Sequence, residues 1–195
     1  MERNISAAIL AGGKNSRMGK DKAFIRINGV TLVQKTVTQL RRIFKEVVIV
    51  TNSPRKYEPY KKHALIVTDI IKNKGPLSGI HSALSQITHK SVFFVACDMP
   101  FLHNDMIERL LIYFNNNECD ALVPKIGTRI EPLHAIYKTR LKGNLEYFLK
   151  NSKNYSVRNF LQTVNTKYME LEDVLVNRHI FKNINSPSDL KNIKK

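Results

Sequence analysis

The chain has 195 residues, of which 43% are hydrophobic, and its formal net charge is +16. This length and apolar content predict one globular domain over 1–195 with a sizeable core, and they exclude a disordered chain. No apolar run approaches the ~20 residues that span a membrane. The N-terminus lacks the pattern of a secretory signal, so we expect a cytoplasmic protein.

The excess of basic residues is large: 32 lysines and arginines face 16 acidic residues. Such a charge favours a polyanionic partner or a substrate with several phosphates, although a generally lysine-rich composition explains it equally well without a function. The basic clusters are short and widely separated, and no basic stripe alternates with aromatic residues. We therefore expect neither nucleic acid nor a membrane as partner. Cys97 and Cys119 form no C-x-x-C pair, so we expect free thiols rather than a zinc site.

Apolar runs alternate with amphipathic ones along the chain, which predicts an α/β fold. The order of strand and helix through the first two-thirds indicates a mainly parallel sheet covered by helices. The predicted strands are Ala7–Leu10, Val47–Val50, Leu65–Thr68, Val92–Ala96, Ala121–Val123 and His134–Tyr137. The predicted helices are Leu32–Phe44, Leu77–Ile87, Asp105–Phe114, Leu141–Leu149 and Val157–Thr163.

The most informative stretch follows the first strand, where Leu10 and Ala11 lead into the pair Gly12–Gly13. Glycines directly after a strand let backbone N–H groups approach an anionic ligand closely. Arg17 and Lys22 follow within the same loop, and both are suited to phosphate oxygens. The spacing matches neither a Walker A loop nor a dinucleotide fingerprint. The alternative is a glycine-rich turn whose cations are exposed to solvent. We interpret Lys20 as such a solvent-exposed cation.

Polar side chains follow three of the predicted strands, and in a parallel sheet Asp98 should face the same crevice as Gly12–Gly13. Asp98 comes after a buried run and is a candidate ligand for Mg²⁺, which prefers one or two carboxylates together with phosphate oxygens and water. Its alternative role is to cap the next helix, for which Asn104 or Asp105 is better placed. Asp69 and Asn52 follow two other strands. Asp69 can accept hydrogen bonds from a guanine base or a ribose, or it can form a turn.

Two further segments carry candidate binding residues. Gly75, Pro76, Leu77 and Gly79 enter a predicted helix whose N–H groups are available to a base or phosphate, although a plain helix start is equally consistent. Near the end of the chain, Asn183 and Asn185 point to the same side of a strand-like stretch, ahead of a helix start at Ser186–Pro187. From the sequence alone they could cap that helix. His134, among apolar residues, is interpreted as a packed residue.

The loop L-A-G-G-x-x-x-R-M-G-x-D-K resembles the signature of nucleotidyltransferases that activate sugars and cofactors. Within that superfamily the chain is most similar to the molybdenum cofactor guanylyltransferase family. The resemblance continues over nearly the whole chain, through Gly75-Pro76-Leu77-Ser78-Gly79-Ile80, Cys97-Asp98-Met99-Pro100-Phe101, Pro132-Leu133-His134-Ala135 and Asn183-Ile184-Asn185-Ser186-Pro187.

This resemblance implies a Rossmann-like three-layer nucleotidyltransferase fold, with nucleotide bound by the N-terminal part and acceptor by the C-terminal part. It implies transfer of GMP from GTP to the phosphate of molybdopterin or molybdenum cofactor, with Mg²⁺ as cofactor. Proteins that deliver or accept the molybdenum cofactor are compatible with it as further partners. The implied catalytic residues are Arg17, Lys22 and Asp98, with Asp98 holding the metal. The implied nucleotide ligands are Leu10, Ala11, Gly12, Gly13, Lys22, Asn52, Asp69, Gly75, Pro76, Leu77, Gly79 and Asp98, and the acceptor ligands are Asn183 and Asn185.

Three alternatives remain open at this point. Two are enzymes of the same superfamily, a CTP-dependent cytidylyltransferase for the same cofactor and a guanylyltransferase for a cobinamide phosphate. The third is a nucleotide-binding module without catalysis, which the positive charge allows. The joint presence of Asp98 and Lys22 argues against the third, because both groups serve charge compensation during phosphoryl chemistry.

Overall fold

The computed structural model describes residues 4–12, 21–171, 181 and 184. Its central feature is a sheet with strand order β10-β7-β9-β6-β1-β4-β5, in which β8 pairs with β7 off this path. The strands are β1 (Ile5–Leu10), β4 (Val47–Val50), β5 (Leu65–Val67), β6 (Ser91–Ala96), β7 (Ala121–Ile126), β8 (Arg129–Ile130), β9 (His134–Lys138) and β10 (Thr166–Glu170). A separate hairpin is formed by β2 (Arg26–Ile27) and β3 (Val30–Thr31).

The sheet is mainly parallel, as predicted. The strand β1 runs parallel to both β4 and β6, β4 to β5, and β7 to β10. Within this sheet, only β9 and the short β8 run antiparallel to their neighbours among the described strands. Parallel strands place their carboxyl ends at one edge, where ligands of such sheets bind.

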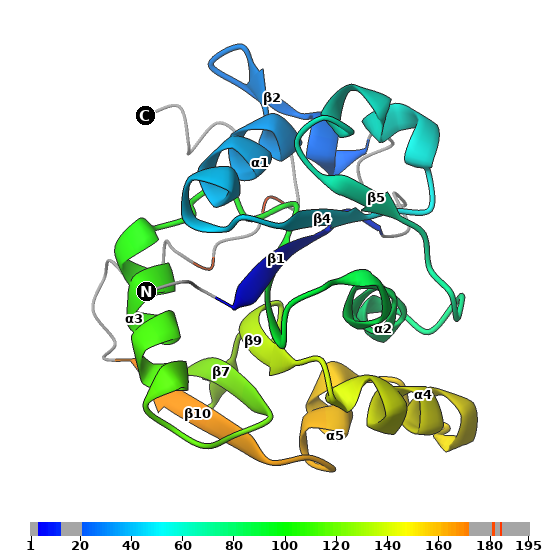
Figure 1. Cartoon of the computed structure of the whole chain (residues 1–195), viewed down its shortest axis with the longest axis vertical. Helices are drawn as coiled ribbons and strands as arrows, with labels where there is room; N and C mark the ends of the chain where they lie inside the picture. Colours follow the sequence, from blue (N-terminus) through cyan, green and yellow to red (C-terminus); the bar gives the residue numbers. More distant parts are fainter. Residues whose placement is uncertain (1–3, 13–20, 172–180, 182–183, 185–195) are drawn as a thin grey trace.

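Helices cover both faces of the sheet, which gives three layers (Figure 1). One face carries α1 (Leu32–Ile43) and α3 (Asn104–Asn115), and the other carries α2 (Pro76–Gln86), α4 (Leu141–Asn151) and α5 (Val157–Leu161). Alternate residues of β1 pack against the helices on opposite faces of the sheet, because successive side chains of a strand point to opposite faces. Ala7 and Ile9 belong to the core beneath α1 and α3, whereas Ala8 and Leu10 belong to the core beneath α2.

All six predicted strands and all five predicted helices are present, with ends that agree with the prediction to within three residues. Asn104 or Asp105 was predicted to be the N-cap of α3, and this prediction was wrong. His103 is the N-cap residue, and Asn104 is the first residue of the helix. The Asn104 side chain instead accepts a hydrogen bond from Gln39 at 2.7 Å. Among the described residues no helix is long and apolar enough to cross a membrane.

Two short 3-10 helices were not predicted. The first, η1 (Lys22–Phe24), follows the glycine loop, and the second, η2 (Pro54–Tyr60), follows β4. Prolines at positions 54 and 59 conceal η2 in the sequence, since proline opposes a regular helix. Tyr57 of η2 is nevertheless fully buried in the core. The helix η1 comes after the loop that follows β1, and η2 comes directly after β4. Both short helices therefore lie beside the carboxyl edge of the sheet.

Candidate active site

Four strands end at the same level along the carboxyl edge of the sheet. Leu10 of β1 is paired with Val50 of β4 and with Ala96 of β6, and Val50 is paired with Val67 of β5. Main-chain hydrogen bonds continue this order one residue further, for example from the Ala11 N–H to the Val50 carbonyl at 2.8 Å. Two residues beyond the paired row come four predicted site residues: Gly12, Asn52, Asp69 and Asp98.

Lys22 and Asp98 meet at this edge. The Lys22 ammonium donates a hydrogen bond to Asp98 Oδ2 at 2.9 Å, although the two residues are 76 positions apart. Their side chains are 28% and 18% exposed, so the ion pair is partly shielded from water but open to a ligand. A cation and a carboxylate in contact can compensate the charge of a triphosphate and of a metal ion bound to it.

Asn52 and Asp69 also form a pair, further along the same edge. The Asn52 amide donates to Asp69 Oδ2 at 2.6 Å, and the Asp69 N–H donates to Asn52 Oδ1 at 3.3 Å. This reciprocal contact fixes the orientation of the Asp69 carboxylate. Asn52 and Asp69, which were predicted separately, are therefore hydrogen-bonded to each other in the structure.

The N-terminus of α2 closes the edge beside Asp69. Gly75 caps the helix with φ +64° and ψ −150°, a conformation that only glycine adopts readily. Gly79 allows a close approach, since a Cβ there would lie 2.9 Å from Leu10 Cδ2 and 3.9 Å from Asp69 Oδ1. The Leu77 side chain is fully buried in the core. The assignment of Leu77 as a nucleotide ligand remains a prediction.

The C-terminal part of the chain reaches the site through Ile184. The Ile184 N–H donates to the main-chain carbonyl of Asp98 at 2.9 Å, and Ile184 is fully buried. Phe181 packs edge-on against the His134 ring, with a centroid distance of 5.1 Å. The position between Asn183 and Asn185 is thus attached to the residue predicted to hold the metal.

Several predicted site residues lie outside the described residues: Gly13, Arg17, Asn183 and Asn185. Their assignments remain predictions. The same holds for the predicted helix start at Ser186–Pro187.

Burial shifts the pKa of two groups near the edge, Cys97 and His134. Burial, with the charges of Asp98 and Asp21, raises the pKa of the Cys97 thiol, which is therefore a protonated packing residue. Cys97 and Cys119 are both free, as predicted. Burial, together with the neighbouring His103, lowers the pKa of His134 to about 3. His134 is accordingly a neutral packed ring, in agreement with its interpretation from sequence.

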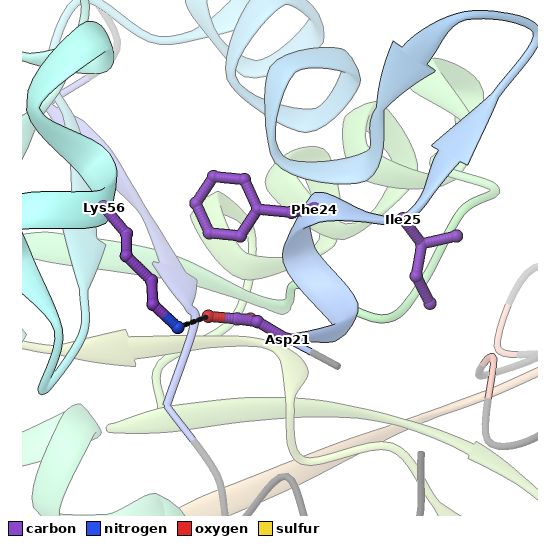
Figure 2. Close-up of a pocket in the computed structure, with 4 residues that line it drawn as sticks. All are labelled: Asp21, Phe24, Ile25 and Lys56. Atoms are coloured by element: carbon purple, nitrogen blue, oxygen red, sulfur yellow. Dashed lines mark ion pairs between the residues drawn. The ribbon is translucent and has the colours of Figure 1, made fainter. Parts of the chain in front are cut away.

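A pocket of about 470 Å³ adjoins the site on the side of η1 and η2. It is lined by Asp21, Phe24, Ile25 and Lys56, and Figure 2 shows the ion pair between Asp21 and Lys56 at its border. The sequence predicts no role for these four residues. Asp21 stands inside the recognised motif, directly before Lys22, and this position was the one available signal.

Comparison with known proteins identifies the family. Residues 7–168 match the model of the MobA-like NTP transferase domain. The chain belongs to this family. A protein named "Probable molybdenum cofactor guanylyltransferase" from Peptoclostridium acidaminophilum is 40% identical over 171 residues, which cover 84% of this chain and 75% of the relative. The molybdenum cofactor guanylyltransferase of Syntrophotalea carbinolica is 33% identical over 192 residues, covering 95% of this chain and 89% of the relative.

A solved structure with a related sequence has the same architecture. Molybdopterin-guanine dinucleotide biosynthesis protein A from Archaeoglobus fulgidus superimposes with a TM-score of 0.83 at 28% identity, over 97% of this chain and 96% of that chain. The predicted Rossmann-like nucleotidyltransferase fold is therefore confirmed. As a MobA-like NTP transferase, the protein is an enzyme of the nucleotidyltransferase class.

Proposed function

We propose that the protein transfers GMP from GTP to the phosphate of molybdopterin or its molybdenum-bearing form. An oxygen of the acceptor phosphate attacks the α-phosphorus of GTP, a new P–O bond forms, and the bond to the departing pyrophosphate breaks. The relatives named as molybdenum cofactor guanylyltransferases support the choice of guanine and of this acceptor.

The observation that carries the proposal is the contact between Lys22 and Asp98 at the carboxyl edge of the sheet. Negative charge accumulates on the departing pyrophosphate during transfer, and stabilising it requires positioned charges rather than an enzyme nucleophile. Lys22 offers its ammonium to those oxygens. The protonated Cys97 thiol beside Asp98 is unsuited to nucleophilic attack, which agrees with direct in-line transfer.

The residues present fit a magnesium ion that arrives with the nucleotide. The described residues contain no cluster of three or more metal-ligating side chains. The lone carboxylate of Asp98 suits Mg²⁺, which takes most of its ligands from phosphates and water. When bound, the ion polarises the phosphoryl oxygens and neutralises their charge. Asp98 would hold it, and Lys22 would then move its hydrogen bond from Asp98 toward the phosphates.

The paired residues farther along the edge mark the nucleoside end. Asp69 uses one carboxylate oxygen for Asn52, and Oδ1 faces the N-terminal part of α2 near Gly79. We assign Oδ1 to the base or ribose of GTP, and the backbone of Gly75, Pro76 and Leu77 to the same end of the nucleotide. Asn183 and Asn185 would serve the acceptor, since Ile184 between them contacts Asp98 at the opposite end of the row.

The test is release of pyrophosphate from each of the four nucleoside triphosphates with Mg²⁺, in the presence and absence of molybdopterin. We expect release only when GTP and molybdopterin are both present, with the guanine dinucleotide form as the second product by chromatography. Release with CTP instead of GTP would reassign the base, and release with a cobinamide phosphate in place of molybdopterin would reassign the acceptor. Binding of GTP without any transfer would contradict catalysis altogether.

A further inference from the structure

Asp21 is a carboxylate beside the proposed triphosphate site, where its negative charge would repel the phosphates. It directly precedes Lys22, and its side chain is only 17% exposed. Asp21 Oδ1 caps η1 by accepting a hydrogen bond from the Ala23 N–H at 3.3 Å. Asp21 Oδ2 lies 3.5 Å from the ammonium of Lys56, as Figure 2 shows. The cap accounts for one oxygen, and the other depends on Lys56.

Lys56 is held in reach of Asp21 by the packing of η2 against η1. The Phe24 ring packs on the Tyr57 ring with a centroid distance of 5.0 Å. Tyr57 is fully buried, and its hydroxyl donates to the Ala11 carbonyl at 3.4 Å. The segment that carries Lys56 is therefore fixed to the end of β1 as well as to η1.

An unpaired Asp21 carboxylate would have two harmful effects. It would repel the incoming triphosphate, because like charges in a partly buried site are weakly screened. It would also compete with Asp98 and the phosphates for the ammonium of the adjacent Lys22. Pairing with a second cation removes both effects and leaves the cap of η1 in place.

We propose that Lys56 is a positioning residue that neutralises Asp21 and so keeps Lys22 available to Asp98 and the triphosphate. Lys56 acts through Asp21 and does not itself bind phosphate. The inference rests on the proposed nucleotidyl transfer, and it adds to it a requirement carried by η2, an element outside the predicted site.

Three variants test this role. Lys56→Met removes the cation, and Lys61→Met is the matched control, because Lys61 lies next to η2, is similarly exposed and pairs with Glu58 at 2.8 Å. Both variants lower the net charge equally. We expect Lys56→Met to raise the KM for GTP about fivefold, with a smaller change in kcat, as for the loss of one partly exposed ion pair. Lys61→Met should change neither constant.

The deciding variant is Asp21→Asn combined with Lys56→Met. Asparagine keeps an oxygen for the Ala23 N–H, so η1 stays capped, and no carboxylate remains to be neutralised. We expect the KM for GTP to return close to that of the unmodified protein. A double variant as impaired as Lys56→Met alone would overturn the proposal, since Lys56 would then contact phosphate directly. Equal effects of Lys56→Met and Lys61→Met would also overturn it, in favour of a diffuse positive field.

Calorimetric titration of the same variants with GTP and Mg²⁺ separates the two proposals. Affinity should follow the same order as the KM values, whether or not transfer occurs. An unmodified protein that binds GTP but releases no pyrophosphate with molybdopterin would contradict the proposed function alone. Unchanged GTP affinity in Lys56→Met would contradict the role of Lys56 alone.

Discussion

Asp98 has two separate roles at the level of single atoms. Its carboxylate faces Lys22, while its main-chain carbonyl accepts the hydrogen bond from Ile184. A side-chain substitution therefore tests the chemistry without removing the backbone contact. We expect Asp98→Asn to fold with an unchanged unfolding midpoint and to lose Mg²⁺-dependent pyrophosphate release by about 100-fold or more. Retention of full activity by this variant would exclude Asp98 as the metal ligand.

Lys22 offers a comparison within one motif, because Lys20 stands two positions before it. Lys22 contacts Asp98, and in the proposed function it also binds the triphosphate, so its loss would remove a charge-assisted interaction with the nucleotide. We expect Lys22→Ala to weaken GTP binding at least tenfold, the usual scale for a hydrogen bond to a charged group. Lys20→Ala should bind GTP almost normally in the same titration. Similar losses in both variants would mean that the loop acts only through its overall charge.

At the scale of elements, the start of α2 depends on the unusual backbone of Gly75. Its φ of +64° with ψ of −150° is accessible mainly to glycine, so Gly75→Ala should destabilise the protein by about 1–3 kcal/mol. Gly143, exposed in α4 with open space around its Cβ position, provides the control. Gly143→Ala should stabilise by about 0.5–1 kcal/mol, because alanine favours a helix interior. Urea unfolding measures both; destabilisation of equal size at the two sites would show that the conformation of Gly75 is not required.

The elements that the sequence predicted are those whose signal is local. Buried strands such as β1 and β6 are continuous apolar runs, and the rule that ligands bind at carboxyl ends was enough to place Gly12 and Asp98 at one edge. The strand β10 was missed because it lies at the sheet edge and only Met169 of its residues is buried. The contacts of Asp21 with Lys56 and of Asp98 with Ile184 were also missed. Each joins positions far apart in sequence, and no local pattern encodes such a meeting.

For the whole molecule, the buried His134 makes stability depend on pH. Its pKa is about 3 in the folded protein against 6.5 in an exposed histidine. A depressed pKa gives stability that is fully present above 6.5 and is lost as the pH falls toward 3, because the unfolded chain binds the proton first. Between pH 7 and pH 5 this loss is about 2 kcal/mol.

Urea unfolding at those two pH values checks this expectation. The His134→Leu variant should lose less stability on acidification than the unmodified protein. His63→Gln, at an exposed position, should behave like the unmodified protein. If His134→Leu loses as much unfolding free energy between the two pH values as the unmodified protein, other groups cause the acid sensitivity.

Glu46 affects stability at lower pH. Burial of Glu46 raises its pKa, but hydrogen bonds from Ser6, Thr88 and His89 outweigh this effect and lower the pKa below 4.5.

The hydrogen bond from Ile184 to Asp98 can form only late in synthesis, because Ile184 is translated long after Asp98. The strands whose carboxyl ends form the candidate site, β1, β4, β5 and β6, all precede Asp98 in the chain and are translated before it. Ile184 follows 86 residues later, after β9 has to insert beside β6. A nascent chain thus presents the half that we propose to bind the nucleotide long before the half proposed to bind the acceptor can be joined to it. Premature release of the chain would yield a product with the first half of the site and without the contact that completes it.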